Sequence, residues 1–587
     1  MVGAKKDNGY YVIIIRSLVA PGRNFVNCNY NYFAMRTLLS FLLTSFLCTS
    51  QVQANFISAT SANYTSYLSG LQAGDTLFLA AGNYVNQLNL SNKNGTASDP
   101  IVIMGDGNST VFLGNACCNT VNLTDCSYIV IRNFKIDGQN IDYIDGVKAG
   151  GGATHFAHHI TLEDLYIVNN GGSIDGDNQT VAISTKCAAW AWTIRRCIII
   201  AAGTGIYLGN SDGTSPFVGG LIENNMVINT RGYNMQIKAQ NNGVRDLFPG
   251  TAVDSQETIV RYNVWSKDVG STQIGQGDGS RPCVLFGHFP PSGNGSNDTY
   301  EVYGNFFYNN PTEALIQITA NTALYNNIFV NHVAPTDYGA VVITNHEGFS
   351  PRDIKVFHNT VVSNSIESGI GLYSPNNAYQ QYCYANAVFS SGATITGFTG
   401  SNSVDNVTDD YVNASNYLNA PAAGLPGLDV YPLAGQLQGT LTSSSLMAGY
   451  PDYDKDFNGD TYDWTYRGAY SGSGVNGGWV LQLDTMPTPD GTITATHDAH
   501  GTSDFAGIVY PNPASDVVQL DINAQHNTDV TIILTDLEGH SISTIYTGSL
   551  ISGKNVVSAA LPKVAKGFYL LVIHTVDGVV TKKVLIQ

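Results

Sequence analysis

Residues 301–330 read EVYGNFFYNNPTEALIQITANTALYNNIFV. The segment begins with a short β-type run, a small polar residue and a run of large apolar residues, and the same order returns at its end. Asn305 and Asn327 occupy the polar position of the two copies, and ALIQI lies between them at 314–318. A propeller blade needs about 40 to 50 residues and four strands. A repeat this short instead predicts a coil of two or three short strands.

The same pattern extends over most of the middle of the chain. Successive copies are separated by 31, 33, 28, 38, 42, 22, 32 and 27 residues. Steps this short and variable predict a parallel β-helix, in which an Asn at one bend of each coil hydrogen-bonds its neighbours in a ladder and tolerates a left-handed backbone. We therefore expect a structural role for this position, which is held by Asn133, Asp164, Cys197, Asn225, Asn263, Asn305, Asn327, Asn359 and Asn386.

A second strand is expected in each coil, because a stacked sheet needs one per winding. The candidates are the runs at 145–148, 180–186, 205–210, 234–238, 283–288, 314–318, 340–344 and 369–373. Residues 61–84 are expected to contain a short amphipathic helix that covers the open end of the solenoid. Residues 456–470 are expected to form its final turn.

The composition agrees with an all-β secreted chain. Among 587 residues, 45 acidic side chains outweigh 27 basic ones, giving a net charge of −18, so nucleic acid is not an expected partner. Only 12% of residues are charged, whereas there are 61 Gly, which turn-rich β structure uses at its bends. Residues Met35–Ala54 have the layout of a cleavable signal peptide, after an upstream extension within 1–54. No other stretch is expected to span a bilayer, and a monomer is expected.

Seven cysteines follow the signal segment, at positions 117, 118, 126, 187, 197, 283 and 383. An odd number leaves at least one thiol unpaired. In an oxidising compartment, a bridge from Cys117 or Cys118 to Cys126 is possible. Zinc spacing is absent from the sequence.

The C-terminal part has a specific resemblance. YPNP at 510–513, DLEG at 536–539, GFYLLVI from Gly567 and the terminal KKVLIQ resemble, in order, the C-terminal sorting domain of the type IX secretion system of Bacteroidetes. The resemblance implies interaction with that secretion machinery, export through the outer membrane, and either cleavage of this domain or surface attachment. The expected organisation is a β-helix at 55–483, a Thr/Pro/Gly-rich linker at 484–505 and a small β-sandwich at 506–587.

The repeat region also resembles a known superfamily. GDTLFLAAGNY at 74–84 and DPIVIMGDG at 99–107, together with the Asn-containing repeats, are similar to right-handed parallel β-helix proteins of the pectate-lyase-like superfamily. The resemblance implies a carbohydrate-active protein. It does not name a reaction, because this fold carries lyases, hydrolases, epimerases, esterases and adhesins.

Lysines are scarce, yet Lys148, Lys186 and Lys238 each close a strand of the second set. Stacking would align them into a row of cations, which is costly unless carboxylates or a polyanion offset it. A uronate-containing polysaccharide lying along the solenoid is such a polyanion. Further substrate-binding candidates are Asn210, Gln236, Arg245, Arg281 and Trp190.

The favoured reaction is β-elimination by a polysaccharide lyase. It needs a base for the C5 proton, an acid for the departing oxygen and cations that stabilise the enolate-like charge. Lys238 is the expected base, because neighbouring cations favour a neutral amine. The acid is expected to be Tyr233 or His288, and the carboxylate is expected to be held by Arg231, Arg245 or Arg281.

Two other functions remain open from the residues. A glycoside hydrolase could pair Asp145 with Asp175 or Asp177, and a surface adhesin would bind glycans without chemistry. Calcium is a possible cofactor, because hard cations need several oxygen ligands. Its candidate ligands are Asp145, Asp175, Asp177, Asp212 and Glu223.

Overall fold

A computed structural model describes most of the chain. The described residues are 4–7, 10–13, 54–171, 180–267, 281–333, 338–488, 506–510, 514–524, 527–535, 541–575 and 578–586. The chain divides into two units, 1–53 and 54–587. The first contains an antiparallel pair, β1 (Ala4–Asp7) and β2 (Tyr10–Ile13). The predicted signal peptide lies outside the described residues except for Ala54. No helix within the described part of the chain is long and apolar enough to cross a membrane.

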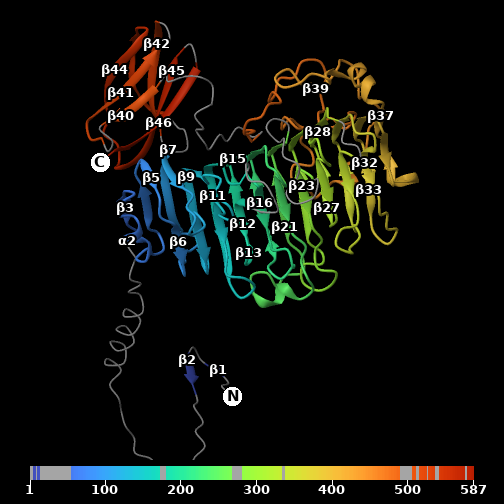
Figure 1. Cartoon of the computed structure of the whole chain (residues 1–587), viewed down its shortest axis with the longest axis horizontal. Coiled ribbons are helices and arrows are strands. Elements are labelled where there is room, and N and C mark those ends of the chain that lie inside the picture. The colour runs from blue at the N-terminus through green and yellow to red at the C-terminus, as the bar shows by residue number, and fades with distance from the viewer. Residues whose placement is uncertain are drawn as a thin grey trace, which may run out of the picture. The chain divides into compact units, whose positions relative to one another are not determined.

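One long side of the second unit is an eleven-stranded parallel sheet, here called sheet 1. All eight strands predicted for the second set lie in it, so that prediction is confirmed. Figure 1 shows these strands stacked along one direction, from blue to yellow. In stacking order they are β6 (Leu88–Ser91), β8 (Val121–Thr124), β10 (Val147–Ala149), β12 (Val181–Thr185), β16 (Thr204–Leu208), β20 (Met235–Ile237), β23 (Val284–Phe286), β26 (Ile316–Ile318), β29 (Val341–Ile343), β32 (Ser368–Leu372) and β35 (Ala393–Thr396).

Two further parallel stacks complete each coil. They share three long strands, β7 (Ile101–Leu113), β9 (Cys126–Asp137) and β11 (Phe156–Val168), which run through the corner between the stacks. Later coils break at that corner. Sheet 2 continues as β14 (Thr193–Arg195), β18 (Leu221–Glu223), β21 (Glu257–Arg261), β24 (Thr299–Tyr303), β27 (Thr322–Tyr325), β30 (Ile354–Phe357), β33 (Gln381–Tyr384) and β36 (Ser403–Val404). Sheet 3 continues as β15 (Ile198–Ile200), β19 (Met226–Ile228), β22 (Val264–Ser266), β25 (Phe306–Tyr308), β28 (Ile328–Asn331), β31 (Thr360–Ser363), β34 (Ala387–Ser390) and β37 (Val407–Asp409).

All ladders between consecutive coils are parallel, which confirms the parallel β-helix. The first coils add β3 (Phe56–Ala59), β4 (Thr76–Leu79) and β5 (Gly82–Tyr84), and a short side ladder joins β11 to β13 (Ala188–Trp190) and β17 (Phe217–Val218). Alternating side chains point inward and form one continuous apolar core along the coils. Isoleucine pairs such as Ile183 and Ile206 on neighbouring strands of sheet 1 are fully buried in it.

The Asn ladder occupies the corner between sheets 2 and 3. Each Asn side-chain amide donates to the side-chain oxygen of the next, at 2.9–3.0 Å, and each backbone N–H donates to the same oxygen. The ladder therefore satisfies polar groups of a fully buried corner. Its members are Asn225, Asn263, Asn305, Asn327, Asn359, Asn386 and a seventh, Asn406, that the sequence pattern missed.

Two predicted ladder positions are wrong by one residue. Leu165 pairs with Phe134 in the register, and these two apolar residues occupy the corner position of their coils. Asn133 and Asp164 instead precede it and have a left-handed backbone, with φ of 60° and 54°. In later coils also, the left-handed residue precedes the ladder Asn, as His358 (φ 52°) precedes Asn359. Each of these coils therefore uses two adjacent positions at the corner. The first adopts the left-handed backbone of the bend, and the second carries the ladder Asn.

The two ends of the solenoid differ. Helix α2 (Thr65–Leu68) spans four residues, and Leu68 and Leu71 pack into the core at the first coils, so a short covering helix is confirmed. Residues 456–470 were expected to form the final turn, and this is wrong. The last solenoid strands are β36 and β37, and the following segment packs back along the corner. Tyr325 donates its hydroxyl to Pro451 O at 2.6 Å, and Asn224 donates to Met486 O at 2.8 Å.

This returning segment, 410–488, is mostly irregular. It contains β38 (Leu418–Ala420) paired antiparallel with β39 (Asp429–Pro432), and the 3₁₀ helices η3 (Tyr411–Asn416) and η4 (Ser444–Leu446). Two others, η1 (Val244–Leu247) and η2 (Gly400–Asn402), lie in loops of the solenoid. A second apolar cluster joins the segment to the outer side of sheets 2 and 3. The segment therefore covers a flank of the solenoid rather than its end.

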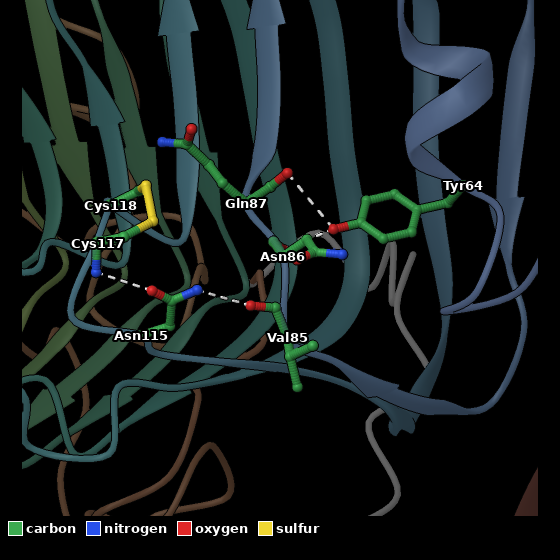
Figure 2. The surroundings of a disulfide bond; sticks show 7 residues. All are labelled: Tyr64, Val85, Asn86, Gln87, Asn115, Cys117 and Cys118. Carbon is green, nitrogen blue, oxygen red and sulfur yellow. Dashed lines mark hydrogen bonds between the residues drawn. A yellow bond between two sulfur atoms is a disulfide. The ribbon is translucent and has the colours of Figure 1, made fainter.

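The bridge to Cys126, which the sequence left possible, does not form. Cys117 and Cys118 are bonded to each other, while Cys126 is a buried free thiol. Figure 2 shows the pair in a loop where Asn115 accepts from the N–H of Cys117 and donates to Val85 O at 2.8 Å. The disulfide therefore constrains a single loop and joins no two coils.

The C-terminal residues form two antiparallel sheets. One has the order β40 (Ala506–Tyr510), β41 (Val517–Ala524), β44 (Gly553–Ala560), and the other β43 (Ser541–Leu550), β42 (Thr528–Thr535), β45 (Gly567–Thr575), β46 (Gly578–Ile586). Val518, Ile532 and Ile573 are among the buried residues of a separate core. This is the predicted small β-sandwich. The predicted linker at 484–505 lies mostly outside the described residues.

Candidate functional site

The three predicted lysines share the outer face of sheet 1. In the register, Lys148 pairs with Ser184, Ser184 with Tyr207, and Tyr207 with Gln236. Lys186 and Lys238 follow directly after β12 and β20, where their backbone N–H groups continue the ladder to Ala149 O and Leu208 O. Because side chains alternate along a strand, residues 184 and 186 point to the same side. We call Lys148, Lys186 and Lys238, with Ser184, Tyr207 and Gln236, the lysine face.

Carboxylates offset two of the three cations. Lys148 Nζ lies 3.3 Å from Asp145 Oδ2, and the Asp145 carboxylate also accepts from Val181 N at 3.0 Å and Ser184 Oγ at 2.9 Å. Lys238 Nζ lies 3.2 Å from Glu347 Oε1. These two carboxylates therefore reduce the electrostatic repulsion that we predicted for a row of three lysines.

Lys186 differs from its neighbours. Burial lowers its pKa to about 7, with Asp145 raising it and the charges of Lys148 and Lys238 lowering it further. Its Nζ lies 3.0 Å from the centroid of the Tyr207 ring, and among the described residues no carboxylate lies within ion-pair distance of it. An amine with this pKa is divided between its charged and neutral forms near pH 7. The neutral form can accept a proton.

Tyr233 lies beside the lysine face. Burial raises its pKa to about 12, and Arg281, Glu313, Tyr207 and Glu347 all influence it electrostatically. The Arg281 guanidinium lies 5.9 Å from the Tyr233 ring centroid. The hydroxyl therefore stays protonated at neutral pH, as a proton donor must. The structure thus places Tyr233 beside Arg281, and Tyr207 of the lysine face and Glu347, the partner of Lys238, act on it electrostatically.

His288 lies on the loop side of the same region. Its ring stacks on Phe349 with 3.4 Å between centroids, and Nδ1 lies 2.9 Å from Phe289 O. Burial lowers the pKa of His288, while the Glu347 charge raises it. The ring is 5% exposed. The hydrogen bond to Phe289 O and the stacking partner hold the imidazole in place, and no described contact joins it to the lysines.

Three other candidates are buried, including Gln236 of the lysine face. Arg245 is fully buried, donates to Gln240 Oε1 at 2.7 Å and pairs with Asp298. Arg245 therefore stabilises its own loop. Its guanidinium has no exposed surface, which does not fit the prediction that it holds a substrate carboxylate. Arg231 is 6% exposed and Gln236 is 2% exposed.

Trp190 and Asn210 have local roles. The Trp190 ring stacks on His158 with 4.2 Å between centroids at 16°, and a side chain at Gly250 would collide with its indole nitrogen. Trp190 is thus packed on two sides, which limits its use for stacking on a sugar ring. Asn210 donates to Thr214 Oγ1 at 2.9 Å within its own turn.

The calcium candidates are dispersed. Asp145 contacts Lys148 and Ser184 of the lysine face. Asp212 caps an exposed turn through Thr214, and Glu223 on sheet 2 pairs with Arg261 at 2.8 Å. Asp175 and Asp177 lie outside the described residues. Within the described ranges, no three or more His, Cys, Asp or Glu side chains gather into a metal-binding group. Calcium therefore stays a prediction that depends on the segment 172–179.

Sequence reasoning missed four residues of this region. Tyr207 and Ser184 alternate with buried apolar residues in their strands, so the register of the stack is the signal that would have found them. Glu347 lies in a loop 109 residues from Lys238, and no sequence signal connects the two. Lys267 is also buried near Arg281: its Nζ donates to Arg281 O at 2.7 Å, and burial lowers its pKa to about 8.

Comparison with known proteins gives a sequence-family match for the C-terminal domain only. The fold defines a parallel β-helix protein, and residues 508–587 match the family described as the secretion system C-terminal sorting domain. This match covers the predicted type IX sorting domain and indicates export to the cell surface or the extracellular space. No curated protein matches the chain in sequence.

Solved structures resemble the solenoid at low identity. An alginate lyase from Paenibacillus sp. str. FPU-7 is 15% identical with a TM-score of 0.30, over 61% of this chain and 98% of that one. Pectate lyase Pel9A is 11% identical with a TM-score of 0.36, over 72% and 92%. A mannuronic acid specific family 6 lyase from human gut microbiota is 10% identical with a TM-score of 0.29, over 58% and 82%.

Proposed function

We propose that this chain is a secreted polysaccharide lyase that cleaves a uronate-containing polysaccharide by β-elimination on the lysine face. The observation that carries the proposal is Lys186, an amine whose pKa lies near 7, between two further ammonium groups on one face of the solenoid. A base works best when its pKa lies near the working pH. A row of cations also suits a polyanionic chain laid across consecutive coils.

The residues then have defined roles. Neutral Lys186 removes the C5 proton of a uronate, the C4–C5 double bond forms, and the C4–O4 bond breaks. Tyr233 donates its hydroxyl proton to the departing O4, and Lys148 and Arg281 neutralise the uronate carboxylate and the charge that develops on it. Lys238, the base expected from the sequence, is paired with Glu347, so we assign the proton transfer to Lys186 instead.

The test is an absorbance assay. We expect the full chain to release products with the ultraviolet absorbance of a C4–C5 unsaturated uronate from alginate, pectate or a glycosaminoglycan. Lys186→Met should lower kcat by at least about a hundredfold, in the range of general base catalysis. Lys135→Met on sheet 3, whose lysine pairs with Asp137 at 3.3 Å, is the matched control.

Two outcomes contradict the proposal. A Lys186→Met variant with full activity removes Lys186 from the mechanism. If no polyanion yields unsaturated product but one retards the chain in affinity electrophoresis, the lysine face binds glycans without cleaving them. Repeating the active reaction with a calcium chelator tests the predicted cofactor, since a calcium-dependent lyase loses activity and regains it when Ca²⁺ is added.

A further inference from the structure

A second polar site lies on the outer side of sheet 2, on another part of the coil from the lysine face. It is a cavity of about 370 Å³, which falls in the size range of small-molecule sites. Strands β21, β24 and β30 line one side, and the returning segment at 445–450 lines the other. We call it the Glu301 cavity. Its lining residues are Glu257, Thr299, Glu301, Lys355, Gln380, Ser445, Leu446, Ala448, Gly449 and Tyr450.

Glu301 and Lys355, an acid and an amine of this cavity, lie on strands that are not adjacent. Glu301 pairs with Ala323, and Ala323 pairs with Lys355, so the acid and the amine stand two strands apart, about 10 Å between backbones. The residue between them carries only a methyl group. Lys355 Nζ donates to the Tyr450 hydroxyl at 2.9 Å. The acid and the amine thus face the cavity separately.

The hydrogen bonding of the buried Glu301 carboxyl group is incomplete within the described residues. It is 5% exposed, and its Oε2 atom has no hydrogen-bond partner among the described residues. Burial first, and then the charge of Glu257, raise its pKa to about 7. A buried oxygen without a partner is costly and uncommon in native structures. Because this oxygen belongs to a cavity-lining residue, a ligand that donates hydrogen bonds would satisfy it.

The lining decides the chemistry of that ligand. Two carboxyl groups, Glu257 and Glu301, oppose an anion, and the Lys355 ammonium opposes a multivalent cation. Thr299 and Gln380 provide neutral hydrogen-bond donors and acceptors on the sheet side of the cavity. Leu446 provides an apolar surface on the opposite side. A compact ligand with many hydroxyl groups and apolar C–H faces meets all of these conditions.

We propose that the Glu301 cavity binds a neutral saccharide unit, whose hydroxyls donate to Glu301 and accept from Lys355. The site differs from the lysine face in sheet, in charge and in ligand. It does not depend on the lyase reaction, because the two sites share no residue.

Isothermal titration calorimetry of the full chain with cellotriose, mannotriose and galactotriose tests the proposal. We expect at least one of these neutral trisaccharides to bind. At pH 8, where the Glu301 carboxyl group is mainly ionised, Glu301→Gln keeps the shape of the side chain and removes its charge, so it should weaken binding about tenfold or more, as expected for hydrogen bonds to a charged group. Lys355→Met should weaken binding as well, because it removes the donor at the other end.

The controls keep the two sites distinguishable. Lys186→Met, which removes the proposed lyase base, should leave trisaccharide binding unchanged, and Glu301→Gln should leave the release of unsaturated uronate unchanged. Thermal unfolding of each variant verifies that it is folded. Absence of binding by all three trisaccharides overturns the proposal. It is equally overturned if Glu301→Gln and Lys355→Met bind like the original chain, or if spermidine binds in a Glu301-dependent way and no trisaccharide does.

Discussion

The ammonium nitrogen of Lys186 lies 3.0 Å from the centroid of the Tyr207 ring, on the outer face of sheet 1. The ring face attracts a cation and favours the charged lysine. Burial and the charges of Lys148 and Lys238 favour the neutral form and prevail, because the pKa of Lys186 falls to about 7. Tyr207 therefore acts against the shift, and its removal should change the reactivity of Lys186 in a defined direction.

We predict that Tyr207→Leu lowers the pH at which lyase activity rises. A base acts in its neutral form, so kcat/KM should increase with pH through about 7 in the original chain and then level off. Loss of a desolvated cation–π contact of about 1–2 kcal/mol lowers the inflection by roughly one pH unit. The measurement is the pH profile of kcat/KM on the polysaccharide that is cleaved.

Tyr207→Phe is the matched control, because it keeps the ring and removes only the hydroxyl that contacts Ser211 at 2.6 Å. Its inflection should stay near that of the original chain. An inflection that moves equally in both variants, or that moves upward in Tyr207→Leu, contradicts the role given to the ring.

The Asn ladder leads to a prediction on stability. Asn327 accepts from Asn305 N and Asn305 Nδ2 and donates to Asn359 Oδ1, all at 2.9–3.0 Å in a fully buried corner. In Asn327→Leu the two Asn305 donors lose their acceptor, so the free energy of unfolding should fall by about 3 kcal/mol or more. The midpoint of urea unfolding measures this change.

The exposed Asn89 on the first strand of sheet 1 provides the comparison. It makes a single described side-chain contact, with Asn122 at 3.0 Å, so Asn89→Leu should change the midpoint little. Similar losses in both variants would mean that the ladder hydrogen bonds add nothing beyond the general cost of removing an Asn.

The sequence predicted the repeat better than its exact register. The strands of sheet 1 were found because a stacked sheet needs one short strand per coil, and such mainly apolar runs lie between successive ladder positions in the sequence. The error at Asn133 and Asp164 arose because both tolerate a left-handed backbone, as the bend requires, while the ladder position beside each holds an apolar residue. Residue type alone cannot separate two adjacent positions that both accept Asn.

The same limit applies to the candidate site. Strand ends placed the three lysines on one face, because residues that close neighbouring parallel strands lie together. The difference between Lys186 and Lys238 depends on Glu347, which a distant loop brings within 3.2 Å of Lys238. Glu301 was overlooked for the same reason, since the segment at 445–450 that encloses its cavity returns from beyond the last coil.

The sorting domain predicts a defined secretion defect. Deleting residues 506–587 removes the whole antiparallel sandwich, which has its own core, and should leave the chain in the periplasm. Cell fractionation followed by immunoblotting measures the distribution. A reporter protein fused to residues 484–587 should in turn reach the surface or the medium. Normal delivery of the truncated chain would show that residues 506–587 do not direct export.

The last prediction concerns acid stability and a buried histidine. His358 is fully buried, its ring stacks on Tyr462 with 3.9 Å between centroids, and neither ring nitrogen has a described hydrogen-bond partner. Burial, with a smaller effect of Arg467, lowers its pKa from the usual 6.5 to about 3. The native imidazole is therefore neutral at pH 5, whereas that of the unfolded chain is mostly protonated. The unfolded state binds more protons, so this residue makes stability fall as pH decreases from 6.5 towards 3.

His358→Phe keeps an aromatic ring against Tyr462 and removes the titration. We expect the variant to lose less stability than the original chain between pH 7 and pH 4, as measured by urea unfolding at each pH. His155→Gln provides the control, because His155 is part-exposed and lies 2.8 Å from Asp125 in another coil. An unchanged pH dependence in His358→Phe would mean that His358 is protonated in the folded chain, or that other groups dominate acid unfolding.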